Sequence, residues 1–390
     1  MLRMHPLALA VSTLASCLAL SAQAQDSAAA KTEAASTRLE EVTVSATRSA
    51  RKVDQVPNTV SVITRKQMDA KVVHNLKDML EGELDLSVRQ ASSRFSVASG
   101  TGRGGVEGIN IRGLEGNQVL MMSDGIRLPN AFSFVSFSTG RGDYIETEGL
   151  KSAEVLRGPA STQFGSDGLA GAVSLRTLDP ADLLKDGKSS AGYVRSSYNG
   201  VDSSWGNTIA AATQSGRLQG LILASQRQGH EVETKGDNAS LNATRTEANP
   251  SDYSSHYVLG KLNFAINPQQ RIGATIESQR RKQDTEVYSA RSVTPPLAAS
   301  SVIDFDTRDN IQRDRVSFDH HYLDLNALWV QKIDTNLYWQ SAENRQFSAE
   351  DRNTAADRTR DNTFSSSVVG LSTVLQSSFA SAAAAHRLTY

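Results

Sequence analysis

The stretch GTGRGG at Gly100–Gly105 has the residue types of a phosphate-binding loop. It lacks the Lys-Ser/Thr pair of G-x-x-x-x-G-K-[ST], and the alternating residues VEGINIRG follow where such a loop would open a helix. The chain also contains no G-x-S-x-G, no H-E-x-x-H and no spaced cluster of metal ligands. These patterns predict neither a nucleotide site, nor a resident metal, nor enzyme chemistry.

Three arginines could instead form buried ion pairs, because Arg112, Arg157 and Arg176 each lie in or beside an apolar stretch. A guanidinium in such a place needs an acidic partner or contact with water, since an unpaired buried charge is costly. One interpretation exposes all three on a free-standing domain. Another pairs Arg157 locally with Glu154, and the residues alone leave both open.

Residues 50–181 are expected to form the small α+β domain that positions these side chains. Val60, Val62 and Thr64 alternate like a strand, and Met68 to Leu80 then follow helical spacing, with Gly82 as a C-cap. His74 falls inside this helix and is expected to be a surface or boundary residue. Further strands are predicted at 109–113, at 118–128 with an Asp124-Gly125 turn, and at 172–175 after a turn at Ser161–Phe164.

The first 24 residues have the pattern of a secretory signal peptide. Arg3 gives a basic start, Leu7–Leu20 is apolar but shorter than the ~20 residues that span a bilayer, and Ala22-Gln23-Ala24 forms a cleavage site. A rival interpretation takes LASC at Leu14–Cys17 as a lipoprotein box and places a lipid on Cys17. In either case the mature protein is expected to leave the cytoplasm.

The composition excludes several classes of protein. Cys17 is the only cysteine, so a chain cleaved after Ala24 has no disulfide framework and no thiolate metal site. The 41 basic and 42 acidic residues nearly balance, which argues against a nucleic-acid partner. Since no long apolar run recurs after the signal, no transmembrane helix is expected, although barrel strands would escape this test.

A short strand is predicted between flexible segments, within residues 25–49. In EEVTVSATR, Val42 and Val44 alternate with Thr43 and Ser45, while the residues on either side are polar or small. No neighbouring segment suggests a pairing partner. The alternative is an ordinary edge strand of the domain at 50–181.

Residues 182–390 show repeated alternation of polar and apolar residues. Val258, Leu262 and Phe264 share one face of a predicted strand, and Lys261 and Asn263 share the other. A transmembrane β-barrel and a soluble β-sandwich both fit this pattern. Tight turns at 214–217 and 266–271 alternate with long polar segments near 226–256 and 279–317, the asymmetry of an outer-membrane barrel, which would place the long segments outside the cell.

The segments VTVSATR, VPNTVSVIT, INIRGLEGNQVLMMSDGIRL, AEVLRGPAS and FGSDGLAGAV, in this order, closely resemble the N-terminal part of TonB-dependent outer-membrane receptors. The resemblance implies a plug domain inside a 22-stranded antiparallel transmembrane barrel in the outer membrane of a Gram-negative bacterium. It implies a TonB box at Glu41, Val42, Thr43, Val44, Ser45 and Ala46, paired to TonB by β-augmentation. It also implies that Arg112, Arg157 and Arg176 meet acidic residues of the inner barrel wall.

The tail is too short for such a barrel. About 220 residues are needed for 22 strands of ~10 residues, whereas the chain after Ser190 has 200 residues including its loops. We expect nine or ten strands and an incomplete barrel, from a fragment or an interrupted gene.

The repeat FSFVSFS at Phe132–Ser138 and the segment GSDGLAGAV resemble the haem and haemoglobin branch of the family, which includes transferrin and lactoferrin receptors. That resemblance implies haem as transported cargo, held by axial His or Tyr ligands. Tyr144, His230 and His256 are the candidate ligands, while the adjacent His320 and His321 cannot both face inward on a strand. A ferric-siderophore receptor and, from another class, an adhesin-type barrel are the alternatives.

Overall fold

The computed structural model describes residues 42–43, 51–52, 59–89, 108–131, 133–134, 137–138, 140–160, 166–185, 187–292, 294–380 and 385–389. The chain divides into two units, Met1–Glu40 and Glu41–Tyr390, and all of the described residues belong to the second. The predicted signal peptide, the alternative lipid site at Cys17 and the stretch at Gly100–Gly105 lie outside the described residues.

Between residues 59 and 183 the chain forms a small α+β domain, called the plug below. Its sheet has the order β3-β10-β11-β6-β7, in which β11 and β6 are parallel and the other neighbours are antiparallel. These strands are β3 (Thr59–Thr64), β6 (Val119–Ser123), β7 (Ile126–Arg127), β10 (Leu150–Arg157) and β11 (Gly171–Thr177). The strands predicted from the sequence and the Asp124-Gly125 turn are therefore present.

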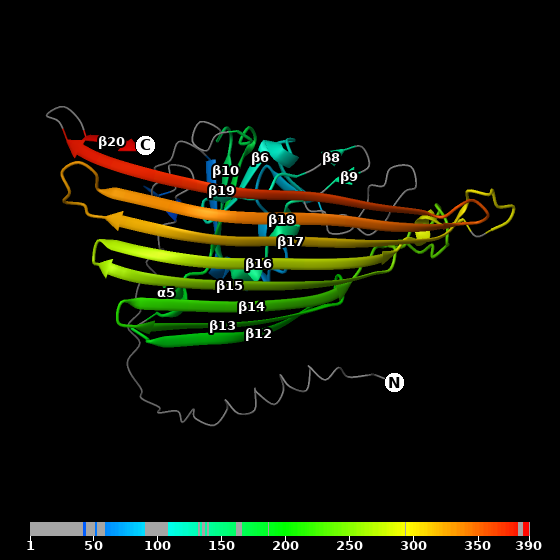
Figure 1. Cartoon of the computed structure of the whole chain (residues 1–390), viewed down its shortest axis with the longest axis horizontal. Helices are drawn as coiled ribbons and strands as arrows, with labels where there is room; N and C mark the ends of the chain where they lie inside the picture. Colours follow the sequence, from blue (N-terminus) through cyan, green and yellow to red (C-terminus); the bar gives the residue numbers. More distant parts are fainter. Residues whose placement is uncertain are drawn as a thin grey trace, which may run out of the picture. The chain divides into compact units, whose positions relative to one another are not determined.

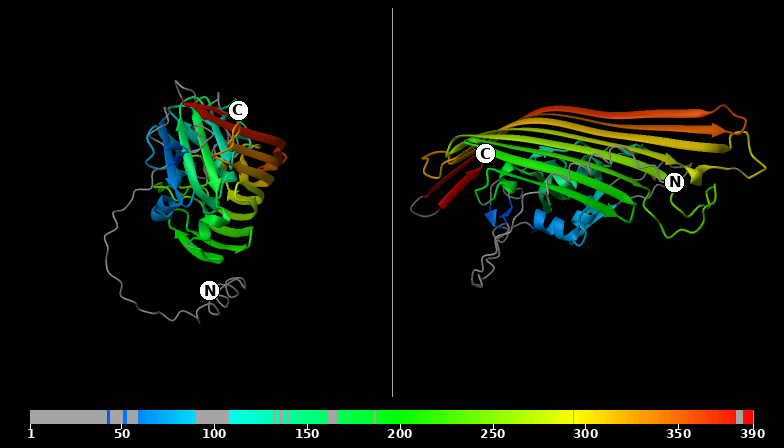
Figure 2. Two further views of the ribbon diagram at one scale, coloured as in Figure 1. Left: turned by 90° about the vertical axis from the view of Figure 1, so that its left-hand side faces the viewer. Right: turned by 90° about the horizontal axis from the view of Figure 1, so that it is seen from below.

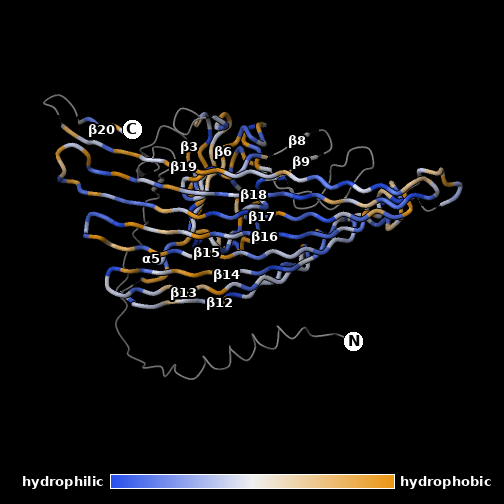
Figure 3. The backbone as a smooth tube through the Cα atoms, in the orientation of Figure 1, coloured by the Kyte–Doolittle hydropathy of each residue, from blue (hydrophilic) through white to orange (hydrophobic). Residues whose placement is uncertain are grey.

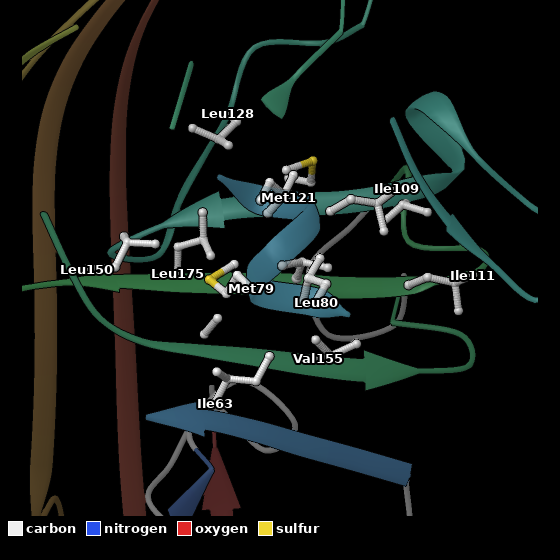
Figure 4. Packing of buried hydrophobic residues seen from close by; sticks show 14 of the residues in the cluster. Ile63, Met79, Leu80, Ile109, Ile111, Met121, Leu128, Leu150, Val155 and Leu175 are labelled. Carbon is white, nitrogen blue, oxygen red and sulfur yellow. The ribbon is translucent and has the colours of Figure 1, made fainter. Parts of the chain in front are cut away.

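Short elements surround this sheet. They are the helices α2 (Arg65–Lys71), α3 (Leu76–Leu80) and α5 (Pro180–Leu183), the 3-10 turns η2 (Gly116–Gln118), η3 (Gly142–Tyr144) and η4 (Thr147–Gly149), and the strand pairs β4 (Leu86–Arg89) with β5 (Gly108–Ile111) and β8 (Ser133–Phe134) with β9 (Phe137–Ser138). Figure 4 shows Met79 and Leu80 of α3 packed against Met121, Val155 and Leu175 of the sheet. This cluster is the hydrophobic core of the plug.

The single helix expected from Met68 to Leu80 is in fact two short helices. Val72 adopts a left-handed conformation with φ of 51° and ends α2. The Asn75 side chain then accepts a hydrogen bond from the Asp78 N–H and caps α3. His74 lies in the turn between the two helices, and not inside a helix, because the capping residue restarts the chain there.

The second structure is a nine-stranded antiparallel sheet, called the wall below, in which every strand pairs with its sequence neighbours (Figure 1). Its strands are β12 (Ser190–Asn199), β13 (Ser204–Ser215), β14 (Leu218–His230), β15 (Ser251–Asn267), β16 (Gln270–Glu286), β17 (Val302–Leu323), β18 (Lys332–Arg352), β19 (Arg358–Ala380) and β20 (Ala385–Thr389). The wall is curved, and the plug lies along its inner side (Figure 2). Within the described residues the wall remains open between β12 and β20.

The wall exposes its apolar face and buries its polar face. On β15, Val258 and Leu262 are 44% and 55% exposed, whereas Lys261 and Asn263 are 7% and 5% exposed and lie on the plug side. A soluble sandwich would bury the opposite face. This inversion is what a bilayer outside and a polar interior require, so the predicted fold class, a plug with an antiparallel barrel-type sheet, is confirmed.

The long strands extend beyond the apolar band. Strands β15 to β19 have 17 to 23 residues, more than the ~9 to 11 that cross a bilayer. Figure 3 shows that their ends at the longer connections are hydrophilic. The predicted loops at 226–256 and 279–317 are therefore too long, since the connections span only 231–250 and 287–301 and the rest pairs as polar strand. Among the described helices, none is both long and apolar enough to cross a membrane.

The strand predicted to be unpaired has a local partner. Val42 and Thr43 form β1, which pairs antiparallel with Lys52 and Arg51 of β2. The prediction that nothing beside it could pair is wrong, because β-ladder bonds use the backbone and do not require apolar side chains. Glu41 and Val44–Ala46 lie outside the described residues.

Candidate functional site at the plug–wall interface

Two buried arginines of β17 join the wall to the plug. The side chains of Arg313 and Arg315 are 2% and 0% exposed. Arg315 Nη2 lies 2.8 Å from Asp124 Oδ2, and Arg315 Nη1 donates to the Ser123 carbonyl at 3.1 Å. Arg313 Nη1 donates to the Tyr144 carbonyl at 3.2 Å. The wall thus holds the plug through a carboxylate and two backbone oxygens.

Glu277 of β16 balances these arginines from within the wall. Its Oε2 lies 2.9 Å from Arg313 Nη2 and 2.8 Å from Arg315 Nε, and its Oε1 accepts a hydrogen bond from the Tyr257 hydroxyl at 3.0 Å. Two buried cations therefore face two carboxylates, Glu277 and Asp124. Such a group is stable only while complete, because removing one member leaves an uncompensated buried charge.

Asp124 is held ionised by its surroundings. Burial by itself would raise the pKa of Asp124, but the charges of Lys261 and Arg315 and a hydrogen bond from Thr177 lower it far below its ordinary value. Asp124 has a left-handed φ of 50° in the turn between β6 and β7, which points this carboxylate at the wall. Lys261 of β15 also lies 3.3 Å from Asp179, whose other oxygen contacts Lys151 at 2.9 Å.

A second contact joins β12 to the first plug helix. Arg195 lies 2.7 Å from Asp69 and 3.2 Å from Glu148, and Arg65 also reaches Glu148 at 2.9 Å. The Glu148 side chain is 6% exposed, whereas Arg195 and Asp69 are 35% and 40% exposed, so water reaches this contact from the Asp69 side.

At a third contact between plug and wall, burial disfavours the ionised form of two carboxyl groups. A cavity of about 70 Å³ between plug and wall is lined by residues that include Asp143, Glu146, His74, Arg227 and Arg281. Burial raises the pKa of Asp143 to about 6 and also raises the pKa of Glu146. The pKa of His74 is lowered by burial and by the charge of Arg227. The Nη1 atom of Arg227 lies 3.1 Å from Nδ1 of the His74 ring.

A larger cavity of about 580 Å³ separates the plug from the wall near the tight turns. Its charged lining comes from both parts: Asp124, Lys151, Arg176 and Asp179 of the plug, and Lys261, Arg271, Asp319, His321, Lys332 and Asp334 of the wall. The interface is therefore tight at the buried arginines and loose on this side.

Within the part of the chain that the structure describes, the three arginines predicted from the sequence have acidic partners inside the plug. Arg157, 3% exposed, lies 2.8 Å from Glu83 and donates to Ser61 and to the Leu84 carbonyl. Arg112 pairs with Asp85 at 3.0 Å, and Arg176 pairs with Glu154 at 3.3 Å while lining the large cavity. Arg157 and Arg176 lie on β10 and β11, the inner strands of the plug sheet, so plug side chains reach these two guanidinium groups first; contact of the three arginines with acidic residues of the barrel wall stays a prediction.

The predicted ligands do not converge. Tyr144 is 1% exposed and packs against Ile311 and Ala342 of the wall, and burial raises the pKa of Tyr144 to about 12, which disfavours the tyrosinate. His256 and His230 lie on the outward face of the wall, and His230 pairs there with Asp252 at 2.8 Å. His321 faces inward between Asp319 and Asp334, while His320 shares the outward face, as the alternation requires.

The sequence interpretation missed the residues that join wall and plug. Arg313 and Arg315 fall in the segment assigned to a loop, although their spacing of two is a strand signal and places both on one face. Among the described residues, no group of three His, Cys, Asp or Glu side chains could hold a metal ion.

A family model of the TonB-dependent Receptor Plug Domain matches residues 52–172. Lactoferrin-binding protein A of Neisseria meningitidis serogroup B is 28% identical over 243 residues, which cover 60% of this chain and 25% of that protein. Transferrin-binding protein A of Haemophilus influenzae is 27% identical over 222 residues, covering 54% and 23%. Hemoglobin and hemoglobin-haptoglobin-binding protein A of Haemophilus influenzae is 25% identical over 311 residues, covering 76% and 28%.

Solved structures share the fold. The FrpB iron transporter from Neisseria meningitidis superposes with a TM-score of 0.60 at 14% identity, covering 82% of this chain and 46% of that one. The siderophore receptor PirA from Acinetobacter baumannii gives a TM-score of 0.60 at 17% identity, covering 86% and 47%.

A plug held against a barrel-type sheet whose outer face is apolar is the architecture that these solved receptors and transporters share. Residues 52–172 therefore contain a plug domain of the kind found in TonB-dependent receptors, as the motifs predicted, and the fold of the described residues resembles that of solved receptors of this kind. The chain spans about a quarter of the length of these curated relatives.

Proposed function

We propose that this chain forms the plug and the first wall strands of a receptor that imports an iron source across the outer membrane. The observation that carries the proposal is the plug seated on the polar inner face of a wall whose outer face is apolar. Such a plug blocks a pore, and transport then requires the plug to move. TonB is the proposed source of that movement, acting through the strand at residues 41–46.

Haem is the proposed cargo, from haemoglobin or another haem protein. The relatives named for haemoglobin, transferrin and lactoferrin support an iron-containing cargo, and the repeat at Phe132–Ser138 favours haem among them. A ferric siderophore is the second candidate, since fold relatives include siderophore receptors. No catalytic step is proposed, because the matches are to binding proteins, receptors and transporters. The resemblance to TonB-dependent receptors implies that import is driven through TonB.

The proposed role of TonB would arise from β-augmentation. A TonB strand would add to residues 41–46 through backbone hydrogen bonds and would pull the plug by its N-terminal edge strand. The pull must overcome the buried pairs at Asp124 and Glu148, so these contacts are expected to set the force at which the plug moves.

The test deletes codons 41–46 in the native gene and compares growth on hemin, haemoglobin or a ferric siderophore as the only iron source. Deletion of Lys31–Ser36, which has the same length, is the control. Loss of growth on hemin with unchanged hemin binding at the cell surface is the expected result. If the strain with residues 41–46 deleted grows like wild type, the proposed role of TonB is contradicted. If the parent strain grows on the siderophore but on neither hemin nor haemoglobin, the siderophore replaces haem as the proposed cargo.

A further inference from the structure

Three arginines surround one buried glutamate at the far end of β18 and β19. The Glu350 side chain is 4% exposed. It accepts hydrogen bonds from Arg358 Nε at 3.0 Å, from Arg358 Nη2, and from Arg360 Nη1 at 2.5 Å. Arg352 Nη2 lies 3.7 Å away from the same carboxylate. One negative charge therefore faces three positive charges.

This arginine cluster, Arg352, Arg358 and Arg360, lies on the inward face of the wall. Even-numbered positions of β18 face the plug, since Gln340 donates to the Arg127 carbonyl of the plug. Glu350 has the same parity, and its partners across β19 follow from the register, in which Arg358 lies opposite Glu350 and Arg360 opposite Ser348.

The cluster lies well beyond the apolar band. On the outward face of β18, the last exposed large apolar side chain in this direction is Trp339, about 36 Å from Glu350 at ~3.3 Å per residue; further along lie only the half-buried Phe347 and, on β17, Ile303. The connection at 353–357 is bonded to the connection at 287–301 through Asn353 N–H and the Ser301 carbonyl. The arginines are thus carried by an ordered, polar end of the wall.

The number of arginines exceeds what holding the two strands together requires. On the outward face of the same strands, Arg345 and Asp361 pair one to one. On the inward face Glu350 leaves an excess of two positive charges, and the next inward acid along the wall is Asp309. Arg358 and Arg360 keep 41% and 37% of their side chains exposed, so further N–H donors reach the surface.

A polar surface leads from this cluster to the plug. Below Glu350, the inward positions of β18 are Ser348, Gln346 and Asn344, which are neutral and buried. They end at Gln340, which contacts both Arg313 and the plug. An anion released from the arginines would therefore meet hydrogen-bonding groups on β18, while Asp309 of β17 lies opposite Gln346.

We propose that Glu350 orients Arg358 and Arg360 as a site that binds the carboxylate groups of an iron chelate before it reaches the plug. Guanidinium groups recognise carboxylates through paired, charge-assisted hydrogen bonds, and a fixed array binds them with less loss of side-chain entropy. The inference rests on the proposed import function and names the ligand chemistry, a carboxylate-bearing chelate, of which haem with its propionates is one.

The experiment measures binding to outer membranes that contain the protein expressed from its own gene. The probes are hemin, hemin dimethyl ester, whose propionates carry no charge, and ferric citrate. R358Q/R360Q is expected to weaken binding of hemin or ferric citrate by about tenfold or more and to leave the ester unchanged. R345Q, on the outward face, is the matched control and is expected to bind all probes like wild type.

E350Q separates a binding role from a structural one. It removes the carboxylate that orients the two arginines, so binding of hemin and ferric citrate should weaken while binding of the ester stays unchanged, whereas a mere strand clasp should lower the amount of folded protein without a change specific to charged probes. Hemin and ferric citrate affinities of R358Q/R360Q within twofold of wild type would overturn the proposal. The proposal would also be overturned if the wild-type protein bound neither hemin nor ferric citrate. If wild type bound ferric citrate alone and R358Q/R360Q lost that binding, the site would be sustained and haem would be rejected as the cargo.

Discussion

At the scale of single residues, the interface between plug and wall depends on charges that water cannot reach. Arg315 is fully buried and contacts Asp124 of the plug and Glu277 of the wall. Burial costs each ion several kcal/mol of hydration, so the group exists only because its members compensate one another. Asp143 differs, because Arg281 lies 3.8 Å away and compensates its burial only in part.

We predict that Asp143→Asn stabilises the plug at pH 7.5 and that this gain shrinks toward pH 4. Burial raises the pKa of Asp143 to about 6 from 3.8, so the folded protein keeps this proton to a higher pH than the unfolded chain does. Stability is then lost as pH rises between these values, and asparagine, which mimics the protonated acid, avoids the loss. Urea midpoints of plug unfolding at several pH values measure the effect.

The control for this prediction is Glu115→Gln, which removes an exposed carboxylate of the plug. It is expected to leave the urea midpoint unchanged at every pH. A difference between Asp143→Asn and wild type that does not vary with pH would contradict the argument.

At the scale of elements, the strand proposed to meet TonB is held by very few bonds. Strands β1 and β2 have two residues each, so their pairing is far shorter than the three or more strands that independent stability usually needs. A partner strand could displace β2 or add to the free edge of β1. These two routes differ, because only displacement of β2 requires the pairing between β1 and β2 to open.

We predict that a disulfide in Val42→Cys/Lys52→Cys blocks energised uptake and leaves surface binding of cargo intact. The two residues are directly paired, and opposite residues in an antiparallel ladder have Cα atoms about 4.5 to 5.5 Å apart, within disulfide range. Growth on hemin with and without a reductant that reaches the periplasm is the measurement. The two single-cysteine variants serve as controls, and full uptake by the verified cross-linked protein would show that the pairing need not open.

At the scale of the second unit as a whole, plug and wall fit without spare room at one point. Gly149 of the plug faces Tyr257 of β15, and a β-carbon on Gly149 would lie 2.5 Å from the tyrosine hydroxyl oxygen. Tyr257 in turn donates to Glu277, the residue that balances the two buried arginines. A change in one part is therefore transmitted to the other through packing as well as charge.

We predict that Gly149→Ala lowers the stability of the docked plug by about 1–3 kcal/mol, the usual cost of overpacking. Combining it with Tyr257→Leu should cost less than the sum of the two single changes, because the smaller side chain makes room. Thermal unfolding of all three variants tests this. Gly108→Ala, where a β-carbon meets nothing within 4 Å, is the control, and strict additivity would argue against the contact.

The sequence by itself determined the elements and the kind of protein. Alternation at Val258, Leu262 and Phe264 set strand faces, Asp124-Gly125 set a turn, and the ordered motifs identified the plug, since all of these depend on neighbours along the chain. The sequence also indicated that the side chains of His320 and His321 must face opposite sides of the wall. Which face of the wall meets lipid became clear only when Lys261 was found buried against the plug.

Only the tertiary structure decided which charges meet. Arg315 and Asp124 are 191 residues apart, and no local pattern links them. Arg157 was noticed for its apolar neighbours, yet its partner Glu83 lies 74 residues away in the plug. Periodicity fixes the face on which a side chain stands, whereas the register of nine strands and the docking of the plug fix what stands opposite. For that reason the fold was predictable and the interface was not.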